Sequence, residues 1–324
     1  MTRTPQRILI IRRRAVGDCL VSMDVARAVR QEWPAARISF VVDRPALDVV
    51  RGSGFVDDVV VYDRRDYAEG PPWRKARRTL QWISSLRAAR PDIVLDLLAT
   101  PQTALWTAAT GAAVRVGPRS RGRTWAYTRV VEPESGVKFA GERFLDWVRA
   151  LGIDPGPWRP HAPASAIAAG ATGDLNLPDG AFVILNPAAT WPSKAWPADS
   201  FAELARQLAS RFVVRLAWGP GEESLRDEIV ERASGAVEPL PATSLAELGA
   251  WIGRAALMVT TDSGPKHLAV AMGTPTLTLF GSTDPRGWQP PGAPHRWLTH
   301  PVSCHPCDLV TCPVPGHPCL DALT

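Results

Sequence analysis

The sequence contains no long apolar run. None of its uninterrupted hydrophobic segments reaches the roughly 18 residues that a membrane-spanning helix needs. The first apolar segment, residues 8–11, is too short for the core of a secretory signal, and no small-residue cleavage site follows it. These absences argue against a helical membrane span, and we expect a cytoplasmic protein.

Signatures of nucleic-acid binding are also missing. We find no zinc-finger, RNA-recognition or helix-turn-helix pattern, and the basic residues are spread along the chain. The net charge is nevertheless +5, and much of the excess is arginine. Such a charge suits an anionic partner, and nucleotide phosphates or an acidic lipid surface fit better than a nucleic acid.

Short β-branched runs alternate with helical patterns in both halves of the chain. Strands are expected at residues 8–11, 38–42, 59–62, 93–97, 114–116, 182–185, 212–216, 257–260 and 276–280. Helices are expected at residues 18–32, 73–89, 199–210, 222–233, 244–253 and 265–272. Runs that are apolar throughout and separated by helices predict parallel strands buried on both faces.

A change of composition separates the two halves. Five prolines and several small residues lie between 154 and 179, a composition typical of a linker. We therefore predict an α/β protein with two Rossmann-like, doubly wound parallel-sheet domains, at residues 1–160 and 179–300. A linker is expected at 161–178 and a cysteine-rich tail at 301–324. Ligands of such sheets bind beyond the carboxyl ends of the strands, so we expect the two domains to face each other across a cleft.

The first segment with chemical potential runs from a strand through three arginines to Gly17 and Asp18. Asp18 could simply cap a helix. In a catalytic role, its carboxylate would take the proton from an attacking hydroxyl, and the helix N-terminus would favour its charged form. The neighbouring arginines would then hold anionic groups of the substrate. This segment alone leaves both roles open.

Residues 186–197 follow a strand of the second half and precede a helix. They offer the hydroxyls of Thr190 and Ser193 and the point charge of Lys194, a set that suits a diphosphate. The alternative is a loop lysine that is merely solvated.

Residues 259–268 run from a strand into Asp262, Ser263 and Gly264, where a helix is expected to begin. The free N–H groups at this helix start and the helix dipole predict an anion site, and Gly264 allows close approach. An ordinary capped helix is the alternative, with His267 as a structural histidine.

A weaker signal lies in the turn that contains Trp218, Gly219 and Glu222. Glu222 or Glu223 could accept hydrogen bonds from ribose hydroxyls. A glycine-rich turn with acidic residues placed to suit the helix dipole explains the same sequence equally well.

No Asp-x-Asp triplet occurs in the sequence. Sugar transferases that chelate the donor diphosphate through a divalent metal often carry one. Its absence, with Lys194 and a helix N-terminus available, favours a leaving-group site that works without a metal.

Taken together, these segments resemble glycosyltransferase family 9, the ADP-heptose:lipopolysaccharide heptosyltransferases, which have the GT-B fold. The resemblance lies in order and context: Gly17-Asp18 at a helix start, Lys194-x-Trp-Pro, the turn at Trp218, and Thr261-Asp-Ser-Gly-x-x-His-Leu-Ala. It extends from about residue 7 to the end of the chain, and its most specific element is Asp-Ser-Gly-x-x-His.

The resemblance implies an inverting glycosyltransferase that moves a heptose from ADP-heptose to a hydroxyl of a lipopolysaccharide-core-type acceptor, with no cofactor required for catalysis. Asp18 would be the catalytic base, and the first domain would bind the acceptor. The second domain would bind the nucleotide-sugar donor. With the segments above, the predicted donor residues are Thr190, Ser193, Lys194, Trp218, Gly219, Glu222, Asp262, Ser263, Gly264 and His267.

Other functions fit the same architecture. The acceptor could be a protein or a secondary metabolite. A two-domain nucleotide-sugar epimerase shares the architecture, and detection of sugar transfer would separate it from a transferase. A regulator that only binds a nucleotide sugar would not depend on Asp18.

Several positions depart from the family's pattern. Arg14 and Ala15 stand where many members have Ser or Thr. Asp24 stands near the place of a usual proline, and Lys266 takes a position that is often smaller in relatives.

Four of the five cysteines lie together near the end of the chain, with the spacing C-x2-C-x4-C-x6-C: Cys304, Cys307, Cys312 and Cys319. In a cytosolic chain this spacing favours metal over disulfides, so we expect a structural zinc or iron site with His305 and His317 in reserve. Four reduced thiols that close a loop are the alternative. Members of the resembling family commonly have cysteines here, and some protein-heptosylating relatives bind iron through a cysteine finger.

A basic loop at residues 118–129 carries Arg119, Arg121 and Arg123. With Arg14 and Arg64, these arginines are predicted to bind an anionic glycolipid acceptor and to contact the inner face of the cell membrane. A solvated loop is the alternative.

Overall fold

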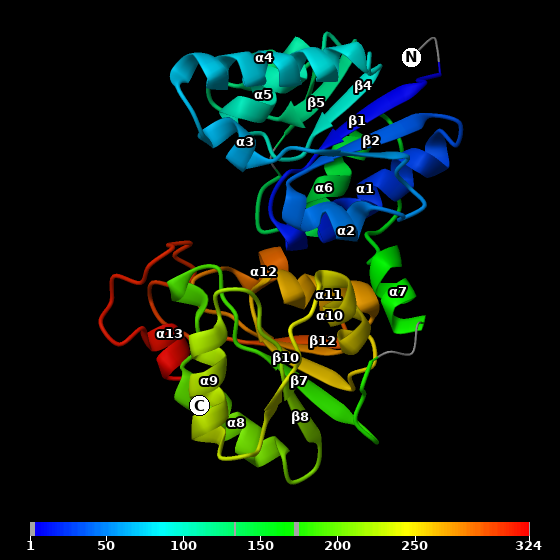
Figure 1. Cartoon of the computed structure of the whole chain (residues 1–324). Coiled ribbons are helices and arrows are strands. Elements are labelled where there is room, and N and C mark those ends of the chain that lie inside the picture. The colour runs from blue at the N-terminus through cyan, green and yellow to red at the C-terminus, as the bar shows by residue number, and fades with distance from the viewer. Residues whose placement is uncertain (1–3, 133, 172–174, 324) are drawn as a thin grey trace. The chain divides into compact units, whose positions relative to one another are not determined.

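The predicted alternation of strands and helices produces two separate parallel sheets (Figure 1). The computed structural model describes residues 4–132, 134–171 and 175–323. By its contacts the chain divides between His161 and Ala162 into two units. In the part of the chain that the structure describes, no helix is long and apolar enough to cross a membrane.

The first unit is built on a six-stranded sheet with the order β3-β2-β1-β4-β5-β6, in which all neighbours are parallel. Its strands are β1 (Arg7–Ile11), β2 (Arg37–Val42), β3 (Asp58–Val61), β4 (Ile93–Asp96), β5 (Val114–Pro118) and β6 (Arg129–Val131). Its helices are α1 (Val16–Glu32), α2 (Leu47–Val50), α3 (Arg64–Ala68), α4 (Pro72–Ala88), α5 (Pro101–Ala109) and α6 (Ala140–Arg149).

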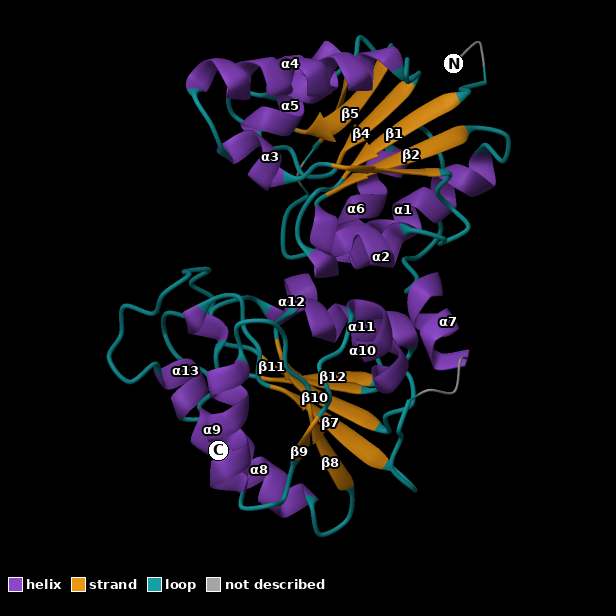
Figure 2. Cartoon of the chain, viewed as in Figure 1, coloured by secondary structure: helices purple, strands orange, loops and turns teal. Residues whose placement is uncertain are grey.

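Helices cover both faces of this sheet, with α1, α2 and α6 on one face and α3, α4 and α5 on the other (Figure 2). The central strands are buried on both faces, which explains why residues 8–11 of β1 and 93–95 of β4 are all apolar. Leu9 and Ile11 of β1 pack with Trp82 of α4 and Trp106 of α5 in one apolar cluster.

The second unit repeats the architecture, with a parallel sheet in the order β12-β11-β10-β7-β8-β9. Its strands are β7 (Phe182–Asn186), β8 (Val213–Leu216), β9 (Glu238–Pro239), β10 (Leu257–Thr261), β11 (Thr276–Leu279) and β12 (His295–Leu298). Its helices are α7 (Ala164–Ala171), α8 (Ala198–Leu208), α9 (Glu223–Ala233), α10 (Leu245–Ile252), α11 (Gly264–Met272), α12 (Pro285–Trp288) and α13 (Pro318–Asp321).

Part of the stretch that we expected to be a linker is helical. Helix α7 is rich in alanine, and its buried Ala166 lies against Gly249 of α10. A Cβ added to Gly249 would stand 2.6 Å from the Cβ of Ala166, so the two helices approach closely because both residues are small. The composition of residues 154–179 did not predict that a helix here would pack on α10.

A buried cluster fastens α1 to the last segment of the first unit. The fully buried Asp24 accepts hydrogen bonds from the side chain of Arg27 and, at 3.1 Å, from the backbone N–H of Arg159. His161 Nε2 lies 2.7 Å from Asp24 Oδ1, and Arg27 donates to the carbonyl of Pro155 at 2.8 Å. Asp24, the residue near a usual family proline, therefore holds Arg159 and His161 on α1, and Arg27 holds Pro155.

Each sheet has one place where the strand order changes direction. In the first unit it lies between β1 and β4, and in the second unit between β7 and β10. Open α/β sheets bind ligands at the carboxyl ends of the strands on either side of such a switch point. The residues just after β1 and β10 are therefore the first places to look for a site.

Candidate functional site

Asp18 lies in the first turn of α1, directly beyond the switch point of the first unit. Its Oδ2 accepts a hydrogen bond from the backbone N–H of Ala15 at 3.1 Å and lies 2.5 Å from Arg12 Nη2. The helix begins at Val16, not at Asp18 as predicted, and Gly17 belongs to its first turn. Asp18 thus caps the helix from its third residue, and its side chain keeps some contact with solvent.

Arg12 connects Asp18 to the neighbouring strand. Besides the ion pair, its Nη1 donates to the carbonyl of Leu97, just after β4, at 2.9 Å. Its guanidinium lies 4.9 Å from the ring centre of Phe144 on α6. Arg12 therefore fixes the Asp18 carboxylate at the switch point, a role that the sequence did not reveal.

Arg13 and Asp43 form a second charged pair at this edge. The Arg13 guanidinium lies over the rings of Tyr62 and Trp106, at 4.5 and 5.4 Å from their centres, and its Nε is 3.5 Å from Asp43 Oδ1. Burial lowers the pKa of Arg13 and raises that of Asp43. Among the described residues, Arg13 Nη1 finds no hydrogen-bond partner, so this buried pair is only partly satisfied.

Three further arginines surround these pairs. Arg14 and Arg64 are exposed, and their charges act on the Asp43 carboxylate. The charges of Arg12 and Asp18 act on the guanidinium of Arg143 on α6. Positive charge therefore exceeds negative charge around Asp18 and Asp43. This edge of the first unit suits an anionic group.

The basic loop contributes less free charge than predicted. Arg119 is held by both carboxylate oxygens of Glu132, and Arg123 donates to Ser120 Oγ at 3.1 Å. Arg121 is exposed. Arg119 nevertheless lines a cavity of about 360 Å³ in the first unit together with Arg143, which leaves it within reach of a ligand there.

The switch point of the second unit lies at the start of α11. Ser263 precedes the helix, and Pro265 occupies one of its first two positions. Asn186, the last residue of β7, donates to Thr260 Oγ1 at 2.9 Å and to Ser263 Oγ at 3.0 Å. Asn186 thereby joins β7 to β10, and the helix presents its first N–H groups, which have no intrahelical acceptors, at this edge.

Asp262 is buried between two lysines. Lys194 Nζ lies 2.7 Å from Oδ2 and Lys266 Nζ lies 2.6 Å from Oδ1. Thr283 also donates to Oδ2, at 2.8 Å. Burial alone would raise the pKa of Asp262, but the charges of Lys266 and Lys194 hold it well below its usual value. A carboxylate and two ammonium groups therefore share one buried network with net positive charge.

His267 follows this network on α11. Burial, and next the charge of Lys266, lower its pKa well below the usual value for histidine, so the imidazole is neutral near pH 7. It lies edge-on to Trp288, with ring centres 6.3 Å apart. His267 can therefore offer a neutral donor at the helix start but no charge.

Ser193 does not fit its predicted role at the donor diphosphate. Its side chain is buried, and its hydroxyl donates to the carbonyl of Leu309 and lies 2.9 Å from Ser282 Oγ. Ser193 therefore anchors the cysteine-rich tail. Thr190, by contrast, is exposed, and Lys194 ends the 3₁₀ helix η3 (Pro192–Lys194) with its amine directed to Asp262.

The turn after β8 is held by its own side chains. Trp218 Nε1 donates to the carbonyl of Leu240 at 2.7 Å, and the backbone N–H of Gly219 donates to Glu222 Oε2 at 2.7 Å. Glu222 is partly exposed, so its carboxylate stays accessible beside this turn. Its contact with a ribose remains a prediction.

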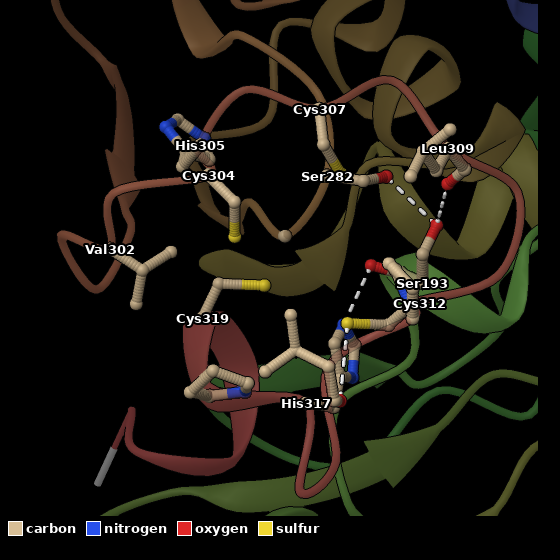
Figure 3. A pocket seen from close by; sticks show the side chains of 14 residues that line it. Ser193, Ser282, Val302, Cys304, His305, Cys307, Leu309, Cys312, His317 and Cys319 are labelled. Atoms are coloured by element: carbon tan, nitrogen blue, oxygen red, sulfur yellow. Dashed lines mark hydrogen bonds between the residues drawn. The ribbon is translucent and has the colours of Figure 1, made fainter.

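The four tail cysteines line one small cavity of about 50 Å³, which Figure 3 shows from close by. Burial, and then the neighbouring thiols, raise the pKa of Cys319 to about 11. Yet within residues 4–132, 134–171 and 175–323 no three His, Cys, Asp or Glu side chains are arranged to hold a metal ion. The predicted zinc or iron site is therefore not supported. His317 instead contacts the Ser193 carbonyl at 3.0 Å.

Two doubly wound parallel sheets, each with charged side chains at its switch point, form the GT-B architecture, which glycosyltransferases share with two-domain nucleotide-sugar epimerases. The family model of glycosyltransferase family 9 (heptosyltransferase) matches residues 79–317, well over half of the chain. The chain belongs to this family and is a glycosyltransferase.

Its similarity to known heptosyltransferases extends over most of the chain. It is 27% identical to lipopolysaccharide heptosyltransferase 3 of Escherichia coli (strain K12) over 298 residues, which cover 85% of this chain and 82% of the relative. It is 25% identical to lipopolysaccharide heptosyltransferase 1 of the same strain, over 86% of this chain and 89% of the relative. The solved structure of E. coli heptosyltransferase WaaC with ADP-2-deoxy-2-fluoro heptose matches with a TM-score of 0.74 at 25% identity, over 91% and 94% of the two chains.

Proposed function

We propose that this enzyme transfers a heptose from ADP-heptose, with inversion, to a hydroxyl group of an anionic lipopolysaccharide-core acceptor. The observation that carries the proposal is the buried Lys194–Asp262–Lys266 network at the start of α11. It gives the second unit a place with net positive charge for a leaving diphosphate. The names of the similar proteins, and the ADP-heptose analogue bound by WaaC, supply the sugar and the nucleotide.

In this mechanism Asp18 accepts the proton of the acceptor hydroxyl. The hydroxyl oxygen attacks the anomeric carbon, and the bond to ADP breaks on the opposite face, which inverts the configuration. Lys194 and the N–H groups at the start of α11 stabilise the charge that develops on the diphosphate. Arg14 and Arg64, with Arg13 behind them, hold an anionic group of the acceptor.

A nucleotide panel followed by a product assay tests this function. In thermal-shift measurements, ADP should stabilise the protein well above UDP or GDP, because binding to the native state raises its apparent stability. Mass spectrometry should then detect a heptosylated lipopolysaccharide-core acceptor. A change of donor stereochemistry without transfer would support the epimerase instead. ADP-heptose binding without any product would support a regulator, and transfer only to a protein or metabolite would change the acceptor.

We also propose that α4 docks the enzyme on an anionic membrane surface, at the cytoplasmic face where a lipid-anchored acceptor is accessible. Trp82 and Leu86 bury one side of the helix in the first unit. Trp73 and Leu80, seven residues apart and so on one side, are 63% and 66% exposed. The helix carries five basic residues and no acidic one. An interfacial helix has this combination of large apolar side chains and cations.

The α4 surface predicts a specific loss of vesicle binding. Replacement of Trp73 and Leu80 by serine should lower flotation with phosphatidylglycerol vesicles about tenfold, because two inserting side chains are removed. Phosphatidylcholine vesicles should bind the wild type weakly, and salt should weaken binding to the anionic ones. The matched control replaces Trp297 and Leu298, two exposed residues of β12, by serine. Equal flotation of the α4 variant and the wild type would refute this docking surface.

A further inference from the structure

We propose that Lys266 is the permanent counter-ion of Asp262, which allows Lys194 to leave Asp262 and pair with the donor diphosphate. The inference rests on the proposed function, because it concerns how the same site receives a nucleoside diphosphate. Lys266 is a positioning residue: it acts on the diphosphate only through Asp262 and Lys194.

The two lysines differ in how much of each side chain is exposed to solvent. The side chain of Lys266 is 0% exposed, and its Nζ is held by Asp262 Oδ1, by the carbonyl of Trp288 at 2.9 Å and by the ring face of Phe280. The Lys194 side chain comes from a 3₁₀ turn and is 13% exposed. Of this pair, Lys194 is the lysine whose side chain keeps contact with solvent.

If Lys194 moved away, Asp262 would still have a counter-ion and a hydrogen-bond donor. Lys266 stays on Oδ1, and the hydroxyl of Thr283 stays on Oδ2 at 2.8 Å. A buried carboxylate that loses its only cation is strongly unfavourable, so a single lysine could not serve both Asp262 and the diphosphate. The second lysine removes this conflict.

Among the described residues, the charged or titratable groups that act most strongly on the Asp262 carboxylate are Lys266, Lys194 and His267. His267 is neutral near pH 7 because burial and the charge of Lys266 lower its pKa. Without Lys266, Asp262 would have to take up a proton when Lys194 moves to the diphosphate.

Calorimetry of the wild type, a Lys266 variant and a double variant tests this assignment. ADP binding is measured at pH 8 in two buffers of different ionisation enthalpy, which reports both affinity and proton uptake. Lys266→Met should weaken ADP binding at least about tenfold and should make binding take up as much as one proton. Asp262→Asn combined with Lys266→Met should recover most of the affinity and abolish the uptake, because no buried charge then needs a counter-ion.

A purely structural role for Lys266 predicts different results. The double variant would then bind ADP no better than Lys266→Met, and no proton would be taken up; either result overturns the proposal, as does wild-type affinity in Lys266→Met. Lys266→Gln, which keeps the chain length and a donor for Trp288, replaces Lys266→Met if that variant does not fold. Lys138→Met, which removes an ion-paired lysine of the first unit, should leave ADP binding unchanged.

The wild type separates this inference from the proposed function. If the wild type does not bind ADP, the nucleotide of the proposed function is wrong. The same calorimetric comparison is then made with inorganic pyrophosphate as the ligand. Lack of binding of pyrophosphate as well would overturn the counter-ion proposal, since it concerns the diphosphate alone.

Discussion

Asp18→Asn is expected to lower the turnover of heptose transfer about 10²- to 10⁴-fold while ADP binding stays nearly unchanged. Asparagine keeps the shape of the side chain and an oxygen for the Ala15 N–H, but it cannot take a proton from the acceptor. The donor contacts that we propose all lie in the second unit, so they do not depend on this carboxylate. Steady-state kinetics with a purified acceptor, beside ADP calorimetry, measure both quantities.

Asp43 provides the matched control for this experiment, because it is the other carboxylate beside the arginines of the same edge. Asp43→Asn should lower turnover far less than Asp18→Asn, since Asp43 is paired with the buried Arg13. Wild-type turnover in Asp18→Asn would end the general-base proposal. A larger loss in Asp43→Asn would move the base to Asp43.

Asp24→Ala should have the largest effect on stability, with a loss of about 3–5 kcal/mol in the free energy of unfolding. The substitution leaves the guanidinium of Arg27 buried without its carboxylate and removes the acceptor for the Arg159 N–H and for His161. Arg159 and His161 would lose their polar attachment to α1, while Pro155 and Trp158 would keep theirs to Arg27 and Val21. Urea unfolding followed by tryptophan fluorescence measures the change.

The pH dependence of stability separates the charge of Asp24 from its shape. Burial would raise the pKa of Asp24, but hydrogen bonds from His161 and Arg27 lower it overall. Its stabilising contribution is therefore complete above the unfolded-state pKa of about 3.9 and is lost as the pH falls through the lower folded-state pKa. Asp24→Asn should be less stable than the wild type at pH 7, and this difference should shrink below about pH 4. A constant difference across that range would contradict the charge argument.

The fold was predictable because its strongest signals are local. Residues 8–11 of β1 and 182–185 of β7 are all apolar because helices cover both sheet faces, and this pattern is visible in the sequence. Edge elements gave weaker signals: β6 has three residues, and β12 is mostly exposed with a histidine and an arginine. Strand ends also located Asp18 and Asp262, because a helix start after a buried strand marks the ligand edge.

The charge network of the site could not be predicted, because it depends on contacts between residues far apart in sequence. Lys194 and Asp262 meet across 68 positions, and Thr283 joins them from the loop after β11. Lys266 is fully buried, although a lysine in a helix is usually exposed to solvent. Ser193 looked like a phosphate ligand, but the tail covers it. Only the tertiary arrangement distinguishes these outcomes.

The order of strands in the first sheet has a consequence for synthesis on the ribosome. β1 is hydrogen bonded between β2 and β4, so the first strand of this sheet to be translated becomes a central one, and its pairing is complete only after residues 93–96 are made. The ladder is then completed by β6, which ends at Val131. Every pairing partner of this sheet thus exists before the second sheet is translated, and the first unit can fold while the rest of the chain is still being made. Protease resistance of nascent chains stalled beyond residue 200 would reveal this order of events.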